Sequence, residues 1–532
     1  MTILKKIKSF LGIKRDGEKK EIIISEEPLE TRVALLEGGV LEEFSIEREG
    51  DRSVSGNIYK GRVHNVEKGL KALFVDVGLE KNAFLHFWDA VPAALDSEIE
   101  RVERQGKRAK TKRITSDDIP RLYPAGADVI VQVTKGPIGT KGARITTNIS
   151  LAGRYLVLMP YSDQSGISRK IEQPSERQRL RKILYALEIP DGMGVIIRTA
   201  GEGMKARFFV RDLAVLLDRW DKVQDDLKNK PAPTILLKEP DLIERTVRDF
   251  LTEDIDSIVV DSEQEANRIR DLVGIISKRS EKKVKFFQEP VPIFEKYQIN
   301  KQIESAFRRQ VWLRSGAYLV IDETEAMVAI DINTGRSKGA KDQDNTILHT
   351  NLEAAEEIAR QLRLRNIGGL IVIDFIDMKS RRDQQNVFDH FRNCLKRDKA
   401  KTHVLPISQL GLLEMTRQRV QESISRAIYM ECPSCKGKGV VKSPETMSVE
   451  IQRELTKTFT QNLDIHELKV VVHPKVMERL RTEDEDILVE LERRFEARLT
   501  FKTDHTFNIE DFKIQNVQTD QEINNNPKSN NP

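Results

Sequence analysis

Two apolar, β-branched runs that each end in an acid constrain the fold of this chain most. The first is Ala326-Met-Val-Ala-Ile-Asp331-Ile-Asn333, and the second is Gly368-Gly-Leu-Ile-Val-Ile-Asp374. Residues 351–365 between them carry apolar side chains at helical spacing, and Gly368 stands where we expect that helix to stop. A strand–helix–strand unit makes the two strands parallel, so both acids lie at carboxyl ends, where open α/β sheets place their sites.

The acids at these strand ends predict a metal site. Asp331 and Asn333 are two residues apart and therefore share one face of a strand, and Asp374 joins them if the strands are neighbours. Carboxylate and amide oxygens suit a hard divalent cation such as Mg²⁺. The alternative is that each aspartate only caps the following turn or helix, but two such strand ends favour the metal site.

Length and composition limit the class of protein. A chain of 532 residues suggests roughly three to five domains or subdomains. The net charge of +4 does not by itself demand nucleic acid, so local charge has to make that case. The three cysteines are too few for a disulfide framework and fit a reducing compartment. With neither a membrane-spanning run nor a signal peptide, we expect a cytoplasmic protein.

The first residues have two interpretations. Apolar side chains recur at helical spacing within residues 2–15, and lysines and arginines lie between them. This pattern fits a short amphipathic helix on an anionic membrane surface, which would place the protein peripherally at the inner face of the membrane. The alternative is a basic extension without that role.

Short alternating runs punctuated by glycine from residue 57 to residue 86 predict a small five-stranded barrel of the oligonucleotide-binding type, closed by a strand after Gly126. Phe74 and Phe84 are spaced to flank one face of it, with Lys60, Arg62 and Lys71 nearby. Exposed aromatic rings stack bases and cations follow phosphates, but both rings could equally belong to the core. Residues 97–118 are so highly charged that we expect a solvated insertion there.

Two further motifs carry chemistry. A strand delivers Arg198 and Thr199 into a glycine-flanked turn, a guanidinium and hydroxyl pair that suits a terminal phosphate, although a plain surface turn is the simpler interpretation. Cys432-Pro-Ser-Cys435 is followed by Lys-Gly-Lys-Gly, which is typical of half a zinc site. Structural zinc takes four ligands, so we expect a second copy of the chain to supply the other pair. A redox dithiol is the alternative, but such motifs usually open a helix.

These motifs together resemble the ribonuclease E/G family. The resemblance rests on Ala-Ile-Asp331-Ile-Asn333, on Thr350 to Arg365, on Gly368 to Met378, on Gly411-Leu-Leu-Glu-Met-Thr-Arg-Gln-Arg419 and on the cysteine pair, and it extends from about Glu30 to the C-terminal domain. Because no long disordered scaffold follows the catalytic region, the ribonuclease G branch is expected.

The resemblance implies an activity. It implies a Mg²⁺-dependent endoribonuclease that cuts single-stranded, AU-rich RNA, prefers 5′-monophosphorylated ends, leaves 5′-phosphate and 3′-hydroxyl products, and acts in rRNA maturation and mRNA decay. It implies Mg²⁺ on Asp331 and Asp374, with Asn333 orienting the scissile phosphate. The other implied site residues are Phe74, Phe84 and Lys141 in the RNA channel, Gly153, Val157, Arg169, Arg198 and Thr199 in a 5′-phosphate pocket, and Cys432 and Cys435 in an intersubunit zinc link. That link implies a homodimer, with pairing of dimers as an extension.

The resemblance also implies an α/β multidomain organisation. The expected regions are a basic amphipathic extension (1–20), an RNase H-like subdomain (21–52 and 243–306), an S1 (OB-type) RNA-binding barrel with the charged insertion (53–144), a 5′-sensor region (145–242), a DNase I-like catalytic subdomain (307–428), a zinc link (429–442), a small α/β C-terminal domain (443–515) and a disordered tail (516–532).

Two departures from the family and two competing functions remain. The insertion at residues 97–118 and the basic N-terminus are extra to the family pattern, and scaffolding at a membrane or cytoskeleton through the N-terminal helix is one competing function. Lys401 stands where ribonuclease E members carry an arginine, which keeps the charge but loses a bidentate fork. The other competing function is a non-cleaving RNA-binding assembly factor of the same fold. The acids at both strand ends argue against it, because a pure binder has no use for carboxylates that repel the RNA backbone.

Overall fold

The computed structural model describes the chain as two compact units, Met1–Ser425 and Arg426–Pro532. The described residues are 19–48, 54–91, 99–102, 115, 118–137, 141–251, 254–276, 278–335, 343–418, 424, 428–461, 465–519 and 522–523. The proposed amphipathic segment 2–15 lies outside them. Among the described residues, no helix is both long and apolar enough to cross a membrane.

The first unit begins with a sheet built from two distant segments, which we call the N-terminal sheet. Its strand order is β16 (Val284–Phe286), β15 (Ser257–Val260), β1 (Lys20–Glu26), β2 (Glu30–Glu37) and β3 (Val40–Arg48). The helices within residues 242–306 are α5 (Leu242–Phe250), α6 (Glu263–Ile276), α7 (Lys278–Glu281), α8 (Ile293–Lys296) and α9 (Ile299–Ala306). Glu21 pairs in parallel with Ser257, so residues 54–237 are an insertion between the two halves of one sheet.

The inserted part opens with a closed barrel, as the glycine-punctuated runs predict. Its strands are β4 (Ile58–Glu67), β5 (Ala72–Asp76), β6 (Ala83–His86), β9 (Arg144–Thr146) and β8 (Asp128–Lys135). Pairing of β8 with β4 closes the ring, and β14 (Thr234–Leu237) adds to β4 from outside. Short helices η2 (Phe87–Ala90) and α2 (Ile119–Leu122) lie within the same segment.

A second inserted sheet, which we call the middle sheet, follows the barrel. Its strand order is β10 (Leu151–Ala152), β11 (Leu156–Met159), β13 (Gly194–Ile197), β12 (Ser165–Ser168) and β7 (Ile99–Val102). Helices α3 (Pro174–Ala186) and α4 (Ala206–Asn229) accompany it, and the aromatic and aliphatic side chains of both contribute to its core.

Strand β7 corrects the prediction that residues 97–118 form a wholly solvated insertion. Residues 99–102 pair with β12, and Val102 is buried in the core of the middle sheet. Glu100 forms ion pairs with Arg177 and Arg181 of α3. Charge density hid this strand because its polar side chains are satisfied by partners about eighty residues away, which composition cannot reveal.

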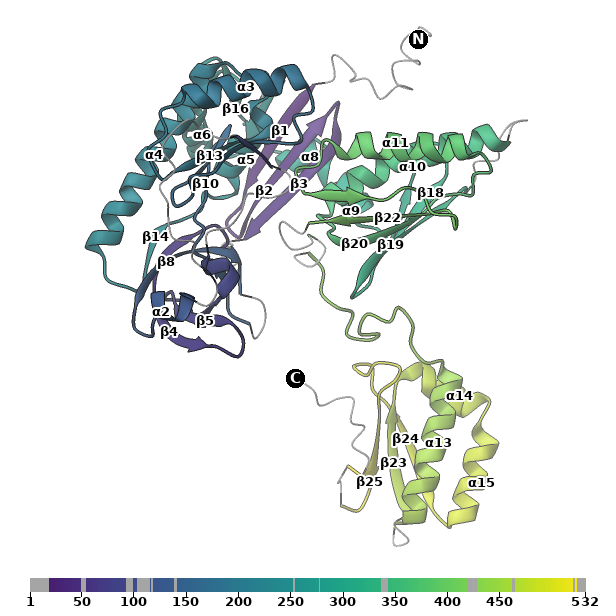
Figure 1. Ribbon diagram of the computed structural model, residues 1–532. Helices are drawn as coiled ribbons and strands as arrows, with labels where there is room; N and C mark the ends of the chain where they lie inside the picture. The colour runs from purple at the N-terminus through teal and green to yellow at the C-terminus, as the bar shows by residue number, and fades with distance from the viewer. Residues whose placement is uncertain are drawn as a thin grey trace. The chain divides into compact units, whose positions relative to one another are not determined.

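The six-stranded sheet carries the two acidic runs. Its order is β17 (Gln310–Trp312), β18 (Tyr318–Glu323), β19 (Met327–Asn333), β20 (Gly369–Asp374), β22 (Leu412–Arg417) and β21 (Thr402–Val404). Helices α10 (Gln343–Leu364) and α11 (Arg381–Leu395) lie on one side of it (Figure 1). Ile330, Ile332, Ile371 and Ile373 pack against these helices, so the alternate side chains of β19 and β20 stand on the uncovered face.

The helix between the acidic strands ends within one residue of its predicted end at Arg365. α10 ends at Leu364, and the residue that closes it is Asn366, which adopts a left-handed conformation with φ of 51°, rather than Gly368. Ile367 N–H donates to the Leu362 carbonyl at 3.1 Å, and Asn366 N–H donates to the Arg363 carbonyl at 3.2 Å. This is a Schellman end closed by asparagine, which tolerates the left-handed region better than most residues.

The second unit is a small α/β domain. A three-stranded sheet has the order β24 (Arg498–Thr503), β23 (Glu467–Val472) and β25 (Phe512–Asn516), and its helices are α13 (Pro444–Gln461), α14 (Pro474–Thr482) and α15 (Glu485–Phe495). The predicted disordered tail starts too early at 516, because Ile523 N–H donates to the Ile514 carbonyl and Ile523 packs on the core.

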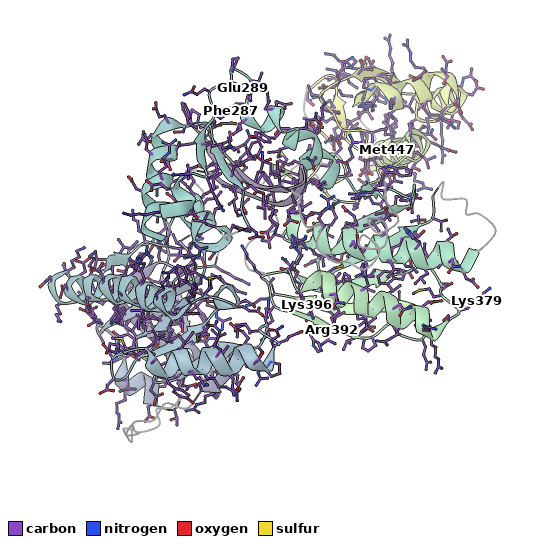
Figure 2. All side chains as sticks on the ribbon, turned by 90° about the horizontal axis from the view of Figure 1, so that it is seen from above. Phe287, Glu289, Lys379, Arg392, Lys396 and Met447 are labelled. Atoms are coloured by element: carbon purple, nitrogen blue, oxygen red, sulfur yellow. The ribbon has the colours of Figure 1, made fainter. Side chains whose placement is uncertain are left out.

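Polar ties join the middle sheet to the six-stranded sheet. Lys170 donates from Nζ to the carbonyls of residues 398, 399 and 400 at 3.1–3.3 Å. Lys396, at the far end of α11 from Lys379 (Figure 2), forms an ion pair with Glu172 at 3.0 Å. Asp398, on the same loop, makes a bidentate pair with Arg417 of β22 at 2.7 and 3.0 Å, and both side chains are buried.

We predict that Arg417→Met loosens the six-stranded sheet by about 3–5 kcal/mol, because it leaves Asp398 charged and buried without its partner. Hydrogen–deuterium exchange of peptides from β20 and β22 measures the local opening free energy. Lys222→Met is the control: its pair with Asp218 on α4 is largely exposed, so its loss is expected to cost less than about 1 kcal/mol. Equal exchange in the two variants would contradict a structural role for the buried pair.

Candidate active site

Strands β19 and β20 bring the two predicted acids side by side. The strands are parallel, and Asp331 is the register partner of Asp374. Paired residues on neighbouring strands, which lie about 4.8 Å apart, point to the same side of the sheet. Asn333 stands on that side too, and its amide donates from Nδ2 to Oδ2 of Asp331 at 2.7 Å. Three oxygen-bearing side chains therefore meet on the open face, at the carboxyl ends of both strands.

A third carboxylate contributes to the electrostatics of this point. The pKa of Asp374 is raised above its usual range by partial burial, then by the neighbouring charges of Asp331 and Asp377. On sequence grounds Asp377 would point elsewhere if its strand continued. However, β20 ends at Asp374. The chain turns there, so that Asp377 stays close enough for its charge to act on Asp374.

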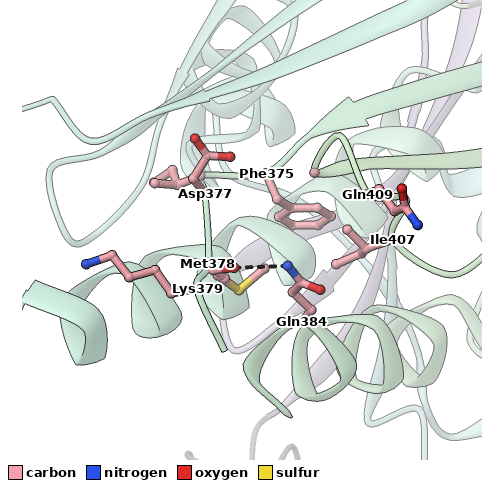
Figure 3. A pocket seen from close by; sticks show the side chains of 9 residues that line it. Phe375, Asp377, Met378, Lys379, Gln384, Ile407 and Gln409 are labelled. Carbon is pink, nitrogen blue, oxygen red and sulfur yellow. Dashed lines mark hydrogen bonds between the residues drawn. The ribbon is translucent and has the colours of Figure 1, made fainter. Parts of the chain in front are cut away.

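Asn351 of α10 fixes the turn that carries Asp377. Its buried side chain donates from Nδ2 to the Ile376 carbonyl at 2.8 Å and accepts from Ile376 N–H at 3.1 Å. The turn borders a pocket of about 240 Å³ lined by residues 375–379, Gln384, Ile407, Gln409 and Gly411. Figure 3 shows the Asp377 carboxylate on the opposite side of this pocket from Gln384, which donates to the Met378 carbonyl.

The donor set fits a hard divalent cation. Among the described residues, neither Asp331 nor Asp374 forms an ion pair with lysine or arginine, so their mutual repulsion has no fixed counter-charge. Mg²⁺ is commonly held by one or two carboxylates while water and substrate phosphates complete its shell. No three His, Cys, Asp or Glu side chains within the described ranges already surround one point as ligands. Asp331 and Asp374 are therefore the residues that would hold such an ion, with Asn333 beside them.

The barrel presents an aromatic pair on its outer surface. Phe74 of β5 is the register partner of Phe84 of β6, with ring centroids 5.9 Å apart, and His86 continues the row 6.4 Å from Phe84. Both phenylalanines are half-buried, whereas Leu73 and Leu85 fill the barrel core. The alternative that both rings are core residues is therefore wrong.

Cations around the barrel divide into two groups. Lys141 is exposed at the entrance to β9, as an RNA contact requires. Lys60, which the sequence placed near the aromatic face, instead donates from Nζ to the carbonyls of Leu227 and Lys230 at the end of α4. A lysine that donates hydrogen bonds to the last carbonyls of a helix stabilises that helix end and therefore has a structural role. Lys60 is thus removed from the candidate RNA contacts.

The middle sheet gathers the predicted phosphate-binding residues at one end. Val157 pairs with Ile196, and Arg198 and Thr199 follow directly after β13. Arg169 follows β12, which runs parallel to β13 with Ile167 opposite Ile197, so Arg169 and Thr199 leave the sheet side by side. Gly153 joins them through its carbonyl, which accepts a hydrogen bond from Nη1 of Arg198. All five residues lie at the same end of the sheet.

Two polar partners shape this end of the middle sheet. Asp212 of α4 accepts hydrogen bonds from the N–H groups of residues 154–156, and a Cβ on Gly153 would lie 2.7 Å from its carboxylate. Arg198 is not free: its Nη2 pairs with Asp249 of α5 at 3.1 Å. Burial alone would raise the pKa of Asp249, but Arg248 and Arg198 hold it below its usual range. Sequence reasoning missed Asp249, because no local pattern marks a counter-ion fifty residues away.

The cysteine pair lies in a turn of the second unit. Cys432 O accepts from Lys436 N–H at 2.8 Å, and Lys436, Gly437 and Gly439 all adopt positive φ. Backbone N–H groups of Cys435 and then Ser434 lower the pKa of the Cys432 thiol. The pair does not open a helix, since α13 begins only at Pro444. This arrangement suits a thiolate metal ligand better than a redox dithiol.

Lys401, the departure from the family pattern, lies immediately before β21, the edge strand of the six-stranded sheet. Its carbonyl accepts from Gln418 N–H at 2.8 Å, beyond the end of β22. Its backbone thus closes the end of that strand pair.

Known proteins are similar to this chain over most of its length. The model of the "Ribonuclease E/G family" matches residues 150–420, and the model "RNase E/G, Thioredoxin-like domain" matches residues 431–517. The chain is 41% identical over 494 residues to Ribonuclease G of Escherichia coli K12, covering 93% of this chain and 99% of that protein. It is 39% identical over 496 residues to Ribonuclease G of Haemophilus influenzae, with the same two coverages. Ribonuclease E of E. coli K12 is 40% identical over 451 residues, 84% of this chain and 41% of that protein.

We predict that Asp374→Asn stabilises the metal-free protein at neutral pH. The pKa of Asp374 in the folded protein lies above its value in the unfolded chain. The contribution of Asp374 to the free energy of unfolding is therefore present at low pH and is lost as the pH rises through the folded pKa. In EDTA at pH 7 the variant should therefore unfold at a higher temperature than the wild type, and this difference should shrink as the pH is lowered toward the pKa of Asp374. Asp389→Asn, which alters an exposed carboxylate on α11, is the control. An unchanged or lower midpoint for Asp374→Asn would contradict the repulsion.

Proposed function

The chain belongs to the ribonuclease E/G family, and on this premise we propose that it is a Mg²⁺-dependent endoribonuclease acting on single-stranded RNA. The observation that carries the proposal is the in-register pairing of Asp331 with Asp374 on an uncovered sheet face. Two adjacent carboxylates without a cationic partner repel a polyanion. They become useful to an RNA-binding protein only when a divalent cation stands between them and a phosphate.

The residues around the acids have distinct tasks in this proposal. Asp331 and Asp374 hold the ion, which when bound activates water and offsets charge on the phosphoryl group. Asn333 keeps Asp331 oriented through its 2.7 Å hydrogen bond and presents its amide to the scissile phosphate. In-line attack of water on phosphorus leaves 5′-phosphate and 3′-hydroxyl ends, and the carboxylates need only hold position.

The barrel and the middle sheet supply the contacts that select RNA. The half-exposed rings of Phe74 and Phe84 offer stacking surfaces for bases, and Lys141 a cation for the backbone. The group of Gly153, Val157, Arg169, Arg198 and Thr199 offers a guanidinium and a hydroxyl to a terminal phosphate. These groups are consistent with unpaired RNA that carries a 5′-monophosphate. From membership of the ribonuclease E/G family we further propose a preference for AU-rich sequence and roles in rRNA maturation and mRNA decay.

A non-cleaving RNA-binding factor is the competing function. Such a factor would use the same barrel and the same proposed phosphate-binding residues. It leaves the acids unexplained, because burial and then the charges of Asp331 and Asp377 raise the pKa of Asp374, and a protein that only binds RNA has no use for this destabilised carboxylate. The electrostatic cost of the pair therefore favours catalysis.

We further propose that Cys432 and Cys435 form half of a zinc site completed by a second copy of the chain. Zinc in structural sites takes four ligands, and the third cysteine, Cys394, lies on α11 in the other unit. The lowered pKa of Cys432 favours the thiolate that binds metal. A zinc-linked homodimer follows from this site. Pairing of two such dimers would use surfaces other than the zinc site.

We predict that Asp374→Asn reduces kcat/KM on a 5′-monophosphorylated AU-rich oligonucleotide more than about 100-fold, because it removes a ligand of the ion. RNA binding should persist or tighten, since a negative charge near the phosphates is lost. Cleavage by gel and binding by anisotropy, with and without Mg²⁺, measure the two effects. Asp389→Asn is the control, and a 5′-hydroxyl oligonucleotide tests the terminal preference. Retained cutting by Asp374→Asn would remove the metal assignment.

We predict that Cys432→Ser releases zinc and halves the mass of the zinc-linked assembly. Metal analysis and sedimentation velocity measure these two quantities. Cys394→Ser should change neither, because that thiol is half-buried on α11. A zinc-loaded assembly of unchanged mass in Cys432→Ser would refute the shared site.

A further inference from the structure

Two aromatic side chains share the open face of the six-stranded sheet with the acids. Trp312 of β17 is the register partner of Tyr318 of β18, and Tyr318 is the register partner of Asn333 of β19. The three side chains therefore form one row across the sheet. We propose that Trp312 and Tyr318 are a stacking platform for an RNA base next to the scissile phosphate; this inference rests on the function proposed above.

The row fixes the distance between the platform and the cutting centre. Adjacent strands are about 4.8 Å apart, so Tyr318 stands one strand and Trp312 two strands, roughly 10 Å, from Asn333. The rings of Trp312 and Tyr318 lie with centroids 5.1 Å apart at an interplanar angle of 53°. A nucleotide bound beside the phosphate that Asn333 contacts would thus place its base over these rings.

The chain after Asn333 is locked against the same hairpin. Gly335 has φ of 54°, and a Cβ there would lie 2.4 Å from the Gly316 carbonyl and 3.3 Å from the Tyr318 ring. Only glycine allows this approach, so the end of β19 and the β17–β18 turn keep one relative position. The aromatic pair is therefore held rigidly with respect to Asp331 and Asn333, as a positioning element requires.

The exposure of Trp312 has no structural explanation within its own sheet. Its neighbours Val311 and Leu313 are buried in the core and already fix the strand, whereas 57% of Trp312 is exposed. Arg314, two residues further on, is also exposed. An indole face with a nearby cation is the combination that binds single-stranded nucleic acid, in which bases stack and cations follow phosphates.

Part of the same face has another apolar patch. Met327 and Leu370 are 40% and 43% exposed, but they stand at the opposite ends of β19 and β20 from the acids. A protein partner would be expected to cover that patch. Trp312 stands instead in the row of Asn333, which favours a base as its ligand.

The test uses the full-length protein and a set of 5′-monophosphorylated oligonucleotides with one cleavage position. Each oligonucleotide carries a single abasic nucleotide at a different position near that bond. In the wild type, one flanking abasic position should lower kcat/KM roughly 5- to 150-fold, the range of one base–aromatic stack. Trp312→Ala should lower kcat/KM on the intact oligonucleotide by a similar factor and should be insensitive to that abasic position. Trp312→Phe should restore part of the sensitivity, and Met327→Ala should behave as wild type.

Two results would overturn the platform. Trp312→Ala could lower cleavage while keeping the wild-type abasic profile, which would make the indole merely structural. Trp312→Ala could also keep the wild-type abasic profile and form a smaller assembly in sedimentation velocity. That result would make this face an interface between copies of the chain.

The same abasic series is also measured as binding to the Asp374→Asn protein. If the wild type cuts no oligonucleotide, the proposed nuclease function fails. The platform is then judged separately by whether Trp312→Ala removes the abasic effect on binding, and a persisting effect would refute it.

Discussion

The parallel pairing of β19 with β20 is the constraint on which the candidate active site depends. It sets Asp331 beside Asp374 at one strand spacing, where partial burial and then the neighbouring negative charge raise the pKa of Asp374. The opposing force is the packing of alternate isoleucines on the two strands beneath α10 and α11. A shift of register by one residue would turn those isoleucines to solvent and the acids into the core, so hydrophobic burial holds the repelling carboxylates in place.

Charged side chains link the six-stranded sheet to the middle sheet and to the N-terminal sheet. Lys170 ties the middle sheet to the loop at residues 398–400, and Asp398 of that loop is anchored on β22 by Arg417. On the other side, Arg360 and Arg363 of α10 bond to the backbone carbonyl of Leu41 and the carboxylate of Glu42 on β3. Directional polar contacts thus set the distance and orientation between the proposed phosphate-binding residues of the middle sheet and the acids of the six-stranded sheet.

The sequence predicted local elements well where the apolar periodicity of a segment matches the core against which it packs. The helix predicted over residues 351–365 ends at Leu364, because its apolar stripe packs in the core of the six-stranded sheet. The prediction failed where the partner is distant. Strand β7 was obscured by its charges, Lys60 was assigned to RNA although it caps α4, and Asp377 could not be placed without knowing that β20 stops at Asp374.

The sequence by itself determined the strand–helix–strand unit, the barrel and the chemistry of the acids and thiols, because period, glycine spacing and ligand type are local properties. Only the tertiary structure decided which residues act together. It aligned Trp312, Tyr318 and Asn333 in one row, gave Arg198 its counter-ion Asp249, and moved both phenylalanines of the barrel out of its core. Each of these depends on strand register or on contacts between segments far apart in the chain, and neither is encoded within a short window of residues.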